Sequence, residues 1–300
     1  MKQAEKQLKD AAKKLFADKK IDLLIGFEKG SLPRRARPVF IRSADDVEKL
    51  VWDETCSNNL TVYLAEMFRP RPTPRGQEPT PMPRIAIVVK GCDALSIGGL
   101  VREKQVIRQN LVVLGMPCTG ITDPVTGEVV ASCVECRHAT PEGVDIVIAG
   151  ECRKPAVETG RGKAIESRSA AERWAYFEKE ISKCIRCYAC RQACPDCYCR
   201  ECFAEQTDPK WVGTSDDPSD TMFYQLGRLF HQAGRCVECG ACMRACPMGV
   251  DLRAIARGLA DDAKELYGFE PGEVMKETPL LCRFKDGDDN EFITDPEKQK

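Results

Sequence analysis

Two cysteine runs constrain this chain more than any other feature of its sequence. The segment "CIRCYACRQACP" has the spacing C-x2-C-x2-C-x3-C-P, and "CVECGACMRACP" repeats that spacing further along the chain. The first run continues until seven cysteines lie between Cys184 and Cys202. The chain contains 18 cysteines but only two histidines, so all-thiolate metal sites are favoured over mixed Cys/His sites.

Each run predicts most of one [4Fe–4S] site. In this bacterial ferredoxin spacing, three close thiolates bind one cluster and the fourth cysteine binds the other cluster. We therefore predict a first cluster held by Cys184, Cys187, Cys190 and Cys246, and a second held by Cys236, Cys239, Cys242 and Cys194. A pair of zinc ribbons is the alternative, although zinc sites usually use two separated C-x2-C pairs.

Three further cysteines, Cys197, Cys199 and Cys202, follow the first run and exceed what its clusters need. Their C-x-C-x2-C spacing could hold another metal, with a fourth ligand such as Cys282. The alternative is that they are thiols packed beside the clusters or near a redox partner.

The N-terminal part, residues 1–160, predicts an α/β domain. Helical periodicity over residues 4–16 precedes two strand-like segments, 21–28 and 38–42. Residues 43–52, with Ser43 as N-cap, and residues 59–68 predict two further helices, and the proline-rich stretch 69–83 indicates an extended loop. The order of apolar strand 84–90, helix 93–105 and apolar strand 110–115 then predicts a parallel βαβ core, and 145–151 adds another strand.

The following part, residues 165–270, predicts helices before, between and after the cysteine runs. Ser169 and Glu172 form a capping-box pattern ahead of the first run. The segment 219–234 predicts a helix that ends on Gly234, and 251–269 predicts an amphipathic helix whose apolar face contains Leu252, Ile255, Leu259, Ala263 and Leu266. Residues 271–300 form a polar tail. This arrangement resembles the α-helical ferredoxin domain of succinate dehydrogenase and heterodisulfide reductase subunits.

A second set of cysteines is dispersed through the α/β part. Cys92 and Cys118 each follow a predicted parallel strand, and the carboxyl ends of such strands form the ligand edge of an open sheet. We predict a third cluster there, held by Cys92, Cys118, Cys133 and Cys136, with Cys56 as the substitute ligand. The alternative is that these cysteines are small buried hydrophobic residues.

Charge and motif content narrow the function classes. Lys plus Arg total 45 and Asp plus Glu total 46, so no basic excess favours nucleic-acid binding. The charged first twenty residues contain no apolar signal region, and no apolar run suits a membrane span, so we expect a cytoplasmic protein. No G-x-G-x-x-G motif supports a dinucleotide such as NAD or FAD, and no G-x4-G-K-[ST] phosphate loop is present.

The segments "KGCDALSI", "LGMPCTGI" and "CVECRH", together with the paired cysteine runs, resemble the coenzyme F(420) hydrogenase/dehydrogenase beta-subunit family. The closer resemblance is to its bacterial iron–sulfur branch associated with heterodisulfide reductase-like and flavin oxidoreductase complexes. The resemblance covers roughly residues 20–270. It implies electron transfer in anaerobic metabolism between a flavoprotein oxidoreductase subunit and a heterodisulfide reductase-like or hydrogenase module; some members also hold FAD.

The sequence therefore favours an iron–sulfur electron-transfer subunit with two [4Fe–4S] clusters and the third described above. Two alternatives stay open. One is a flavin-bearing subunit that itself oxidises or reduces a deazaflavin or nicotinamide coenzyme. The other is a zinc-stapled scaffold without a redox role.

Overall fold

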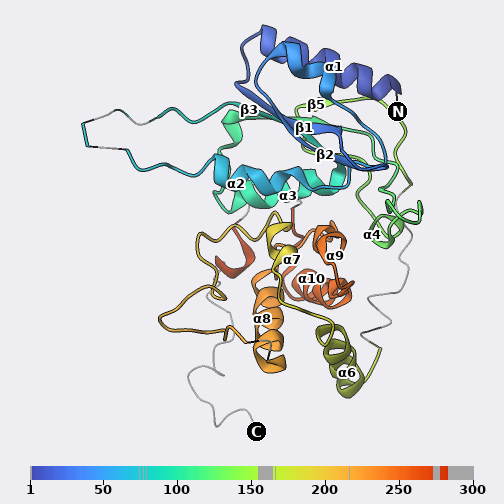
Figure 1. The fold of residues 1–300 in the computed structure, drawn as a ribbon, viewed down its shortest axis with the longest axis vertical. Helices are drawn as coiled ribbons and strands as arrows, with labels where there is room; N and C mark the ends of the chain where they lie inside the picture. Colours follow the sequence, from blue (N-terminus) through green and yellow to red (C-terminus); the bar gives the residue numbers. More distant parts are fainter. Residues whose placement is uncertain are drawn as a thin grey trace.

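The structure is a computed structural model that describes residues 2–73, 75–76, 78, 80–154, 165, 167–215, 217–272 and 278–282. An α/β part lies above a helical part in Figure 1. The expected boundary near residue 160 and most of the expected tail lie outside the described residues. Within the described chain, no helix combines the length and apolar character needed to cross a membrane.

The α/β part is built on a five-stranded sheet with strand order β2-β1-β3-β4-β5. Its strands are β1 (Leu23–Lys29), β2 (Ala36–Ile41), β3 (Ile85–Val89), β4 (Leu111–Gly115) and β5 (Ile146–Val147). All neighbouring pairs are parallel except β1 and β2. The predicted βαβ core is confirmed, because α3 (Gly91–Arg102) connects the parallel strands β3 and β4.

The central strands of the sheet are apolar, and helices cover both of its faces (Figure 1). Every residue of β3 is buried, as expected for a central parallel strand. On one face lies α1 (Lys2–Ala17), whose buried positions Ala4, Leu8, Ala12 and Leu15 recur at helical spacing. On the other lies α3, with α2 (Leu64–Met67) beside it (Figure 1). The helical part is on this second side, next to the strand ends that carry the predicted third site.

The second half of the described chain is helical, with α6 (Ala170–Ile181), α7 (Ala189–Gln192), α8 (Pro218–His231), α9 (Ala241–Ala245) and α10 (Arg253–Tyr267). The capping box of Ser169 and Glu172 is present at the start of α6. A small apolar core joins α6, α8 and the segment before α10 through Phe177, Ile181, Leu229, Val250 and Leu252.

Several boundaries differ from the sequence prediction. Residues Ala44–Lys49 form a 3-10 helix, capped by Ser43, that is shorter than the helix expected over 43–52. The helix expected over 59–68 is confirmed, as a 3-10 turn at Leu60–Tyr63 that continues directly into α2. Helix α8 ends at His231 with Gln232 as its C-cap, and Gly234 adopts a left-handed φ of 68° two residues later. Leu266 is 69% exposed and does not share the buried side of α10.

Short connecting elements complete the fold: α4 (Ala131–Val134), one turn at Arg108–Asn110 and another at Leu280–Cys282. The first of these lies beyond the carboxyl end of β4 and carries Cys133. It therefore brings the "CVEC" segment to the same edge of the sheet as Cys92 and Cys118.

Candidate metal centres

The two cysteine runs fold into loops with the same backbone conformation. Arg186 and Tyr188 have φ values of 49° and 59°, and the corresponding Glu238 and Gly240 have φ values of 55° and 69°. Left-handed residues that alternate with ordinary ones turn successive backbone N–H groups toward one concavity, an arrangement that suits anions and iron–sulfur clusters. In the first loop, the Arg186 amide donates to the Cys184 sulfur at 3.4 Å.

The loops lie side by side where α7 and α9 pack together. A cavity between them is lined by Cys184, Cys187, Cys190, Cys246 and Cys242. The structure therefore brings together the four cysteines predicted for the first cluster, and places Cys242 of the second set beside them. The Val250 amide donates to the Cys246 sulfur at 3.4 Å, and the Gln225 side-chain amide donates to the Cys184 sulfur at 3.3 Å.

The second predicted set also gathers. Burial raises the pKa of the Cys236 thiol, and the neighbouring thiols of Cys242, Cys194 and Cys239 raise it further. Burial likewise raises the pKa of Cys239 to about 12, with Cys194 adding to the shift. Cys194 therefore lies near the run that starts at Cys236, as the crossed assignment requires. Its thiol donates to the Gln232 side-chain oxygen at 3.6 Å.

A buried cation, Arg228, lies between the two sets. It donates to the Cys190 carbonyl oxygen at 3.3 Å. Burial lowers the pKa of this guanidinium, but the nearby sulfurs of Cys242, Cys190, Cys194 and Cys197 outweigh that effect and raise it. A fixed positive charge is what an all-thiolate region needs in order to hold several negative charges away from water.

The third predicted set lies at the carboxyl edge of the sheet. Cys133 and Cys136 accept backbone N–H groups from Ile121 and His138, each at 3.4 Å. Burial raises the pKa of Cys118 to about 11, and the neighbouring Cys133 adds to the shift. Cys92, Cys133 and Cys136 line one cavity, and Cys118 lies near Cys92 and Cys133, so the set is brought to one region.

Gly91 allows this close approach. A Cβ atom at Gly91 would lie 1.9 Å from the His138 carbonyl oxygen, well inside any tolerable contact. The first turn of α3 and the segment after Cys136 are therefore in direct backbone contact. No residue larger than glycine fits there without moving Cys92 away from Cys136.

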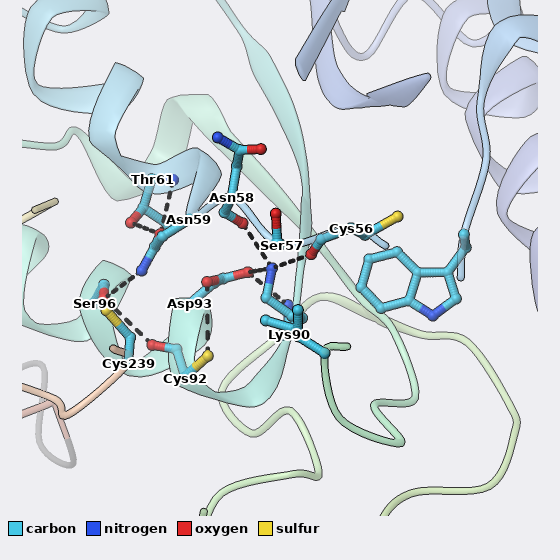
Figure 2. A network of polar contacts seen from close by, with 12 residues as sticks. Cys56, Ser57, Asn58, Asn59, Thr61, Lys90, Cys92, Asp93, Ser96 and Cys239 are labelled. Carbon is cyan, nitrogen blue, oxygen red and sulfur yellow. Dashed lines mark hydrogen bonds and ion pairs between the residues drawn. The ribbon is translucent and has the colours of Figure 1, made fainter. Parts of the chain in front are cut away.

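Lys90 was not singled out from the sequence, yet it forms the polar centre of this edge. Its ammonium group donates to the carbonyl oxygens of Cys56 at 3.2 Å and Asn58 at 2.8 Å, and pairs with Asp93 at 2.9 Å. It also lies 5.0 Å from the centre of the Phe27 ring. Figure 2 shows this network with Cys92 at its side. A lysine directly before "GCD" at a strand end is the signal that could have revealed it.

Lys90 remains a cation in this environment. Burial lowers its pKa, but Asp93 and the sulfurs of Cys92 and Cys118 outweigh that effect and raise it. The charge therefore compensates negative groups on both sides: the carboxylate on α3 and the thiol set at the sheet edge. Lys90 and Arg228 occupy equivalent roles in the two parts of the protein.

The third set also adjoins the second set across the boundary between the two parts. Cys236 and Cys239 line the same cavity as Cys92, Cys133 and Cys136. The Cys239 sulfur is among the groups that raise the pKa of Cys92, after burial and Asp93. Figure 2 shows Cys239 close to the first turn of α3. We call this shared space the interface cavity.

Two arginines of α10 hold two glutamates at the wall of the interface cavity. The sequence "CVEC" occurs twice, and its glutamates are Glu135 and Glu238. Arg257 donates to Glu238 at 2.7 Å and to Glu135 at 3.4 Å, and Arg253 pairs with Glu135. Glu135 is 8% exposed, so the pair with Arg253 is shielded from water. The repeated "CVEC" was visible in the sequence, but its arginine partners were not.

The remaining cysteines take other places. Cys56, the predicted substitute ligand, is 1% exposed, belongs to the apolar core, and has a pKa raised to about 12 by burial. Cys197, Cys199 and Cys202 line a separate cavity together with Cys194.

In the described chain, no three His, Cys, Asp or Glu side chains converge on the position of a single metal ion. A [4Fe–4S] cluster binds each thiolate through a different iron, so its ligands surround a volume instead.

Comparison with known proteins gives partial relatives. No family model matches the chain. It is 33% identical to the F(420)-dependent formate dehydrogenase subunit beta of Methanocaldococcus jannaschii over 116 residues, which is 39% of this chain and 29% of that protein. It is 32% identical to the F(420)-dependent formate dehydrogenase 1 subunit beta of Methanococcus maripaludis over 150 residues, which is 49% of this chain and 37% of that protein. These similarities support the resemblance to F(420) hydrogenase/dehydrogenase beta subunits.

Proposed function

We propose that this protein is an iron–sulfur electron-transfer subunit of an oxidoreductase complex. The observation that carries the proposal is the continuity of its thiol sets. Cys242 of the second set lines the same cavity as the first set, and Cys239 and Cys236 line the interface cavity with the third. Three adjoining thiolate sites make a path from the α7–α9 loops to the carboxyl edge of the sheet.

The donor chemistry fits iron–sulfur clusters. All twelve proposed ligands are cysteines: Cys184, Cys187, Cys190 and Cys246 for the first cluster, Cys236, Cys239, Cys242 and Cys194 for the second, and Cys92, Cys118, Cys133 and Cys136 for the third. Bound clusters supply one-electron chemistry. The chain supplies hydrogen bonds to sulfur, burial and the cations Lys90 and Arg228, and these factors set the potential of a cluster.

The finer proposal concerns domains and partners. We propose an α/β domain over residues 1–160 and a helical dicluster ferredoxin-like domain over 165–270, followed by a polar tail. The relatives are named as subunits of F(420)-dependent formate dehydrogenases. By analogy, the protein would relay electrons between a flavoprotein subunit and a heterodisulfide reductase-like or hydrogenase module in the anaerobic cytoplasm, as in the bacterial branch of the family.

The alternative of a flavin-bearing catalytic subunit makes a different prediction about hydride donors. A cluster accepts single electrons, so NADH or reduced deazaflavin needs a flavin to deliver its two electrons. After anaerobic purification, iron, sulfide and flavin are measured and visible absorption is followed by stopped flow. A relay subunit bleaches with dithionite and not with NADH or reduced deazaflavin until the flavoprotein partner is added. Rapid bleaching by either hydride donor alone would refute the relay and favour the flavoenzyme.

A further inference from the structure

A cavity outside the three thiolate sites has the properties of a small-molecule site. It lies between α2, α7 and α8 and has a volume of about 430 Å³. Ligand pockets typically measure about 300–1,000 Å³. Five arginines line it: Arg69, Arg191, Arg200, Arg228 and Arg235. We call it the arginine cavity; of the proposed cluster ligands, it shares only Cys194.

The charge of the arginine cavity is unbalanced. Arg69 pairs with Glu66, and Arg191 pairs with Glu205 at 2.6 Å, both glutamates being part of the wall. Arg235 pairs with Glu103, at 3.0 Å. Among the described residues, Arg200 and Arg228 have no acidic partner. The wall has three acidic residues, Glu66, Glu205 and the 6% exposed Asp196, against five arginines. The wall therefore carries excess positive charge.

Arg228 is the most deeply buried of the five arginines. It is 7% exposed, donates to one carbonyl oxygen, and its Nε–H has no acceptor in the described part of the chain. A buried donor without an acceptor costs about 1–3 kcal/mol. Arg228 lines both this cavity and the one between the two cysteine loops, so an acceptor on either side would satisfy its Nε–H.

The wall also offers ring surfaces. Tyr198, Phe203 and His231 line the cavity, with Phe203 and His231 packed edge to face at 5.1 Å between centroids. Guanidinium groups match the oxygen geometry of phosphate, and aromatic side chains pack against planar rings. The cavity thus combines the two kinds of group that recognise a phosphorylated aromatic molecule.

We propose that the arginine cavity binds a phosphate-bearing aromatic ligand of nucleotide size, with Arg228 at the buried end as a phosphate contact. Flavin mononucleotide and an adenine nucleotide share this chemistry. Because Cys194 is part of the wall, a ligand bound here would lie against a ligand of the second proposed cluster. The proposal does not rest on the electron-transfer function, since the arginines and the cavity belong to the folded chain itself.

The test is binding to the full chain, purified anaerobically, with flavin mononucleotide, AMP, riboflavin and inorganic phosphate as probes. We expect flavin mononucleotide or AMP to bind below 1 mM and at least about tenfold more tightly than riboflavin or phosphate. Losing a hydrogen bond to a charged group weakens binding by about 10- to 150-fold, so Arg228→Met should show a loss in this range. Arg37→Ala, at an exposed position of β2, is the matched control and should bind as the parent does.

A second variant tests the cavity in case Arg228→Met does not fold. Val62 lines the cavity and is half-buried, so Val62→Trp should fill the space without removing an arginine. In a parallel measurement, the bound probe should slow iodoacetamide labelling of Cys199 and Cys202, which line the cavity, but not of the exposed Cys282. Tighter binding of flavin mononucleotide than AMP identifies a flavin, and the reverse identifies an adenine nucleotide.

Three results would overturn the proposal. No probe binds below 1 mM; or both Arg228→Met and Val62→Trp bind like the parent; or phosphate alone binds as tightly as the two nucleotides. None of these results depends on iron content, which is measured separately. Failure of the proposed electron-transfer function would instead appear as a chain that lacks iron and sulfide.

Discussion

Replacing Lys90 by methionine should destabilise the α/β part strongly. The side chains of Lys90 and Asp93 are 2% and 0% exposed and 2.9 Å apart. Lys90→Met removes the cation, leaves the Asp93 carboxylate buried without compensation, and deprives the carbonyl oxygens of Cys56 and Asn58 of a donor. Breaking one side of a buried pair costs about 3–5 kcal/mol. A domain is stable by about 5–15 kcal/mol, so this loss is a large fraction of the total.

Trp52 provides the signal for this measurement. It is 4% exposed and packs against Phe27, whereas Trp174 and Trp211 are 47% and 53% exposed and can be replaced by phenylalanine. Urea unfolding of the metal-free chain is followed by Trp52 fluorescence. For a urea slope of about 2 kcal/mol per M, the midpoint should fall by about 1.5–2.5 M.

A double-mutant cycle isolates the charge contribution. Asp93→Asn in the Lys90→Met background removes the uncompensated carboxylate, so we expect a coupling energy of about 1–3 kcal/mol. Lys49→Met, at an exposed site, is the matched control and should leave the midpoint unchanged. The reasoning is refuted if Lys90→Met unfolds at the midpoint of that control, or if the two substitutions are additive within about 0.5 kcal/mol.

Four further predictions test the thiolate sites and their supports. Cys194→Ala should perturb the EPR signal of the cluster whose run begins at Cys236; a change confined to the other cluster would contradict the crossed assignment. Cys133→Ser should lower the iron content by one cluster and leave both ferredoxin-type signals; an unchanged iron content would remove the third site. Arg257→Met should lower thermal stability by about 1–2 kcal/mol and slow electron transfer between the second and third clusters in flash reduction, whereas a purely structural role would leave that rate unchanged. Gly240→Ala should destabilise its loop by about 1–3 kcal/mol in urea unfolding, because φ is 69° and the new Cβ would lie 2.6 Å from the Ser132 Oγ; a neutral result would show that the loop can relax.

The sequence was most informative where one local pattern determines the structure. The apolar segments 84–90 and 110–115 predicted β3 and β4, because only a central parallel strand is apolar on both faces. Ser169 and Glu172 predicted the start of α6 through a local capping geometry. Boundaries that depend on tertiary packing were less predictable. The helix expected over 43–52 is instead a shorter 3-10 helix at 44–49.

The candidate sites also contain residues that the sequence predicted and residues that it did not. The cysteine spacing identified which thiols share a loop, because the alternating left-handed residues such as Arg186 and Glu238 act within a few positions. It could not identify the cations Arg228 and Arg257, because both reach their partners through the fold. Arg257 is separated by 122 residues from Glu135, and no local pattern connects the two. Sequence reasoning found the donors of the sites but missed the charges that hold them together.

Ion pairs from the arginines of α10 hold the boundary between the α/β part and the helical part. Apolar packing would tolerate sliding, since it depends on area and has little directional preference. Two glutamates held by Arg253 and Arg257 fix the direction in which each "CVEC" loop presents its cysteines, because hydrogen bonds between guanidinium and carboxylate are directional. Electron transfer depends steeply on separation, so a directional clamp suits a relay better than an apolar contact of equal strength. Glu135 and Glu238 each lie between the two cysteines of their loop, and through their arginine partners they connect both loops to α10.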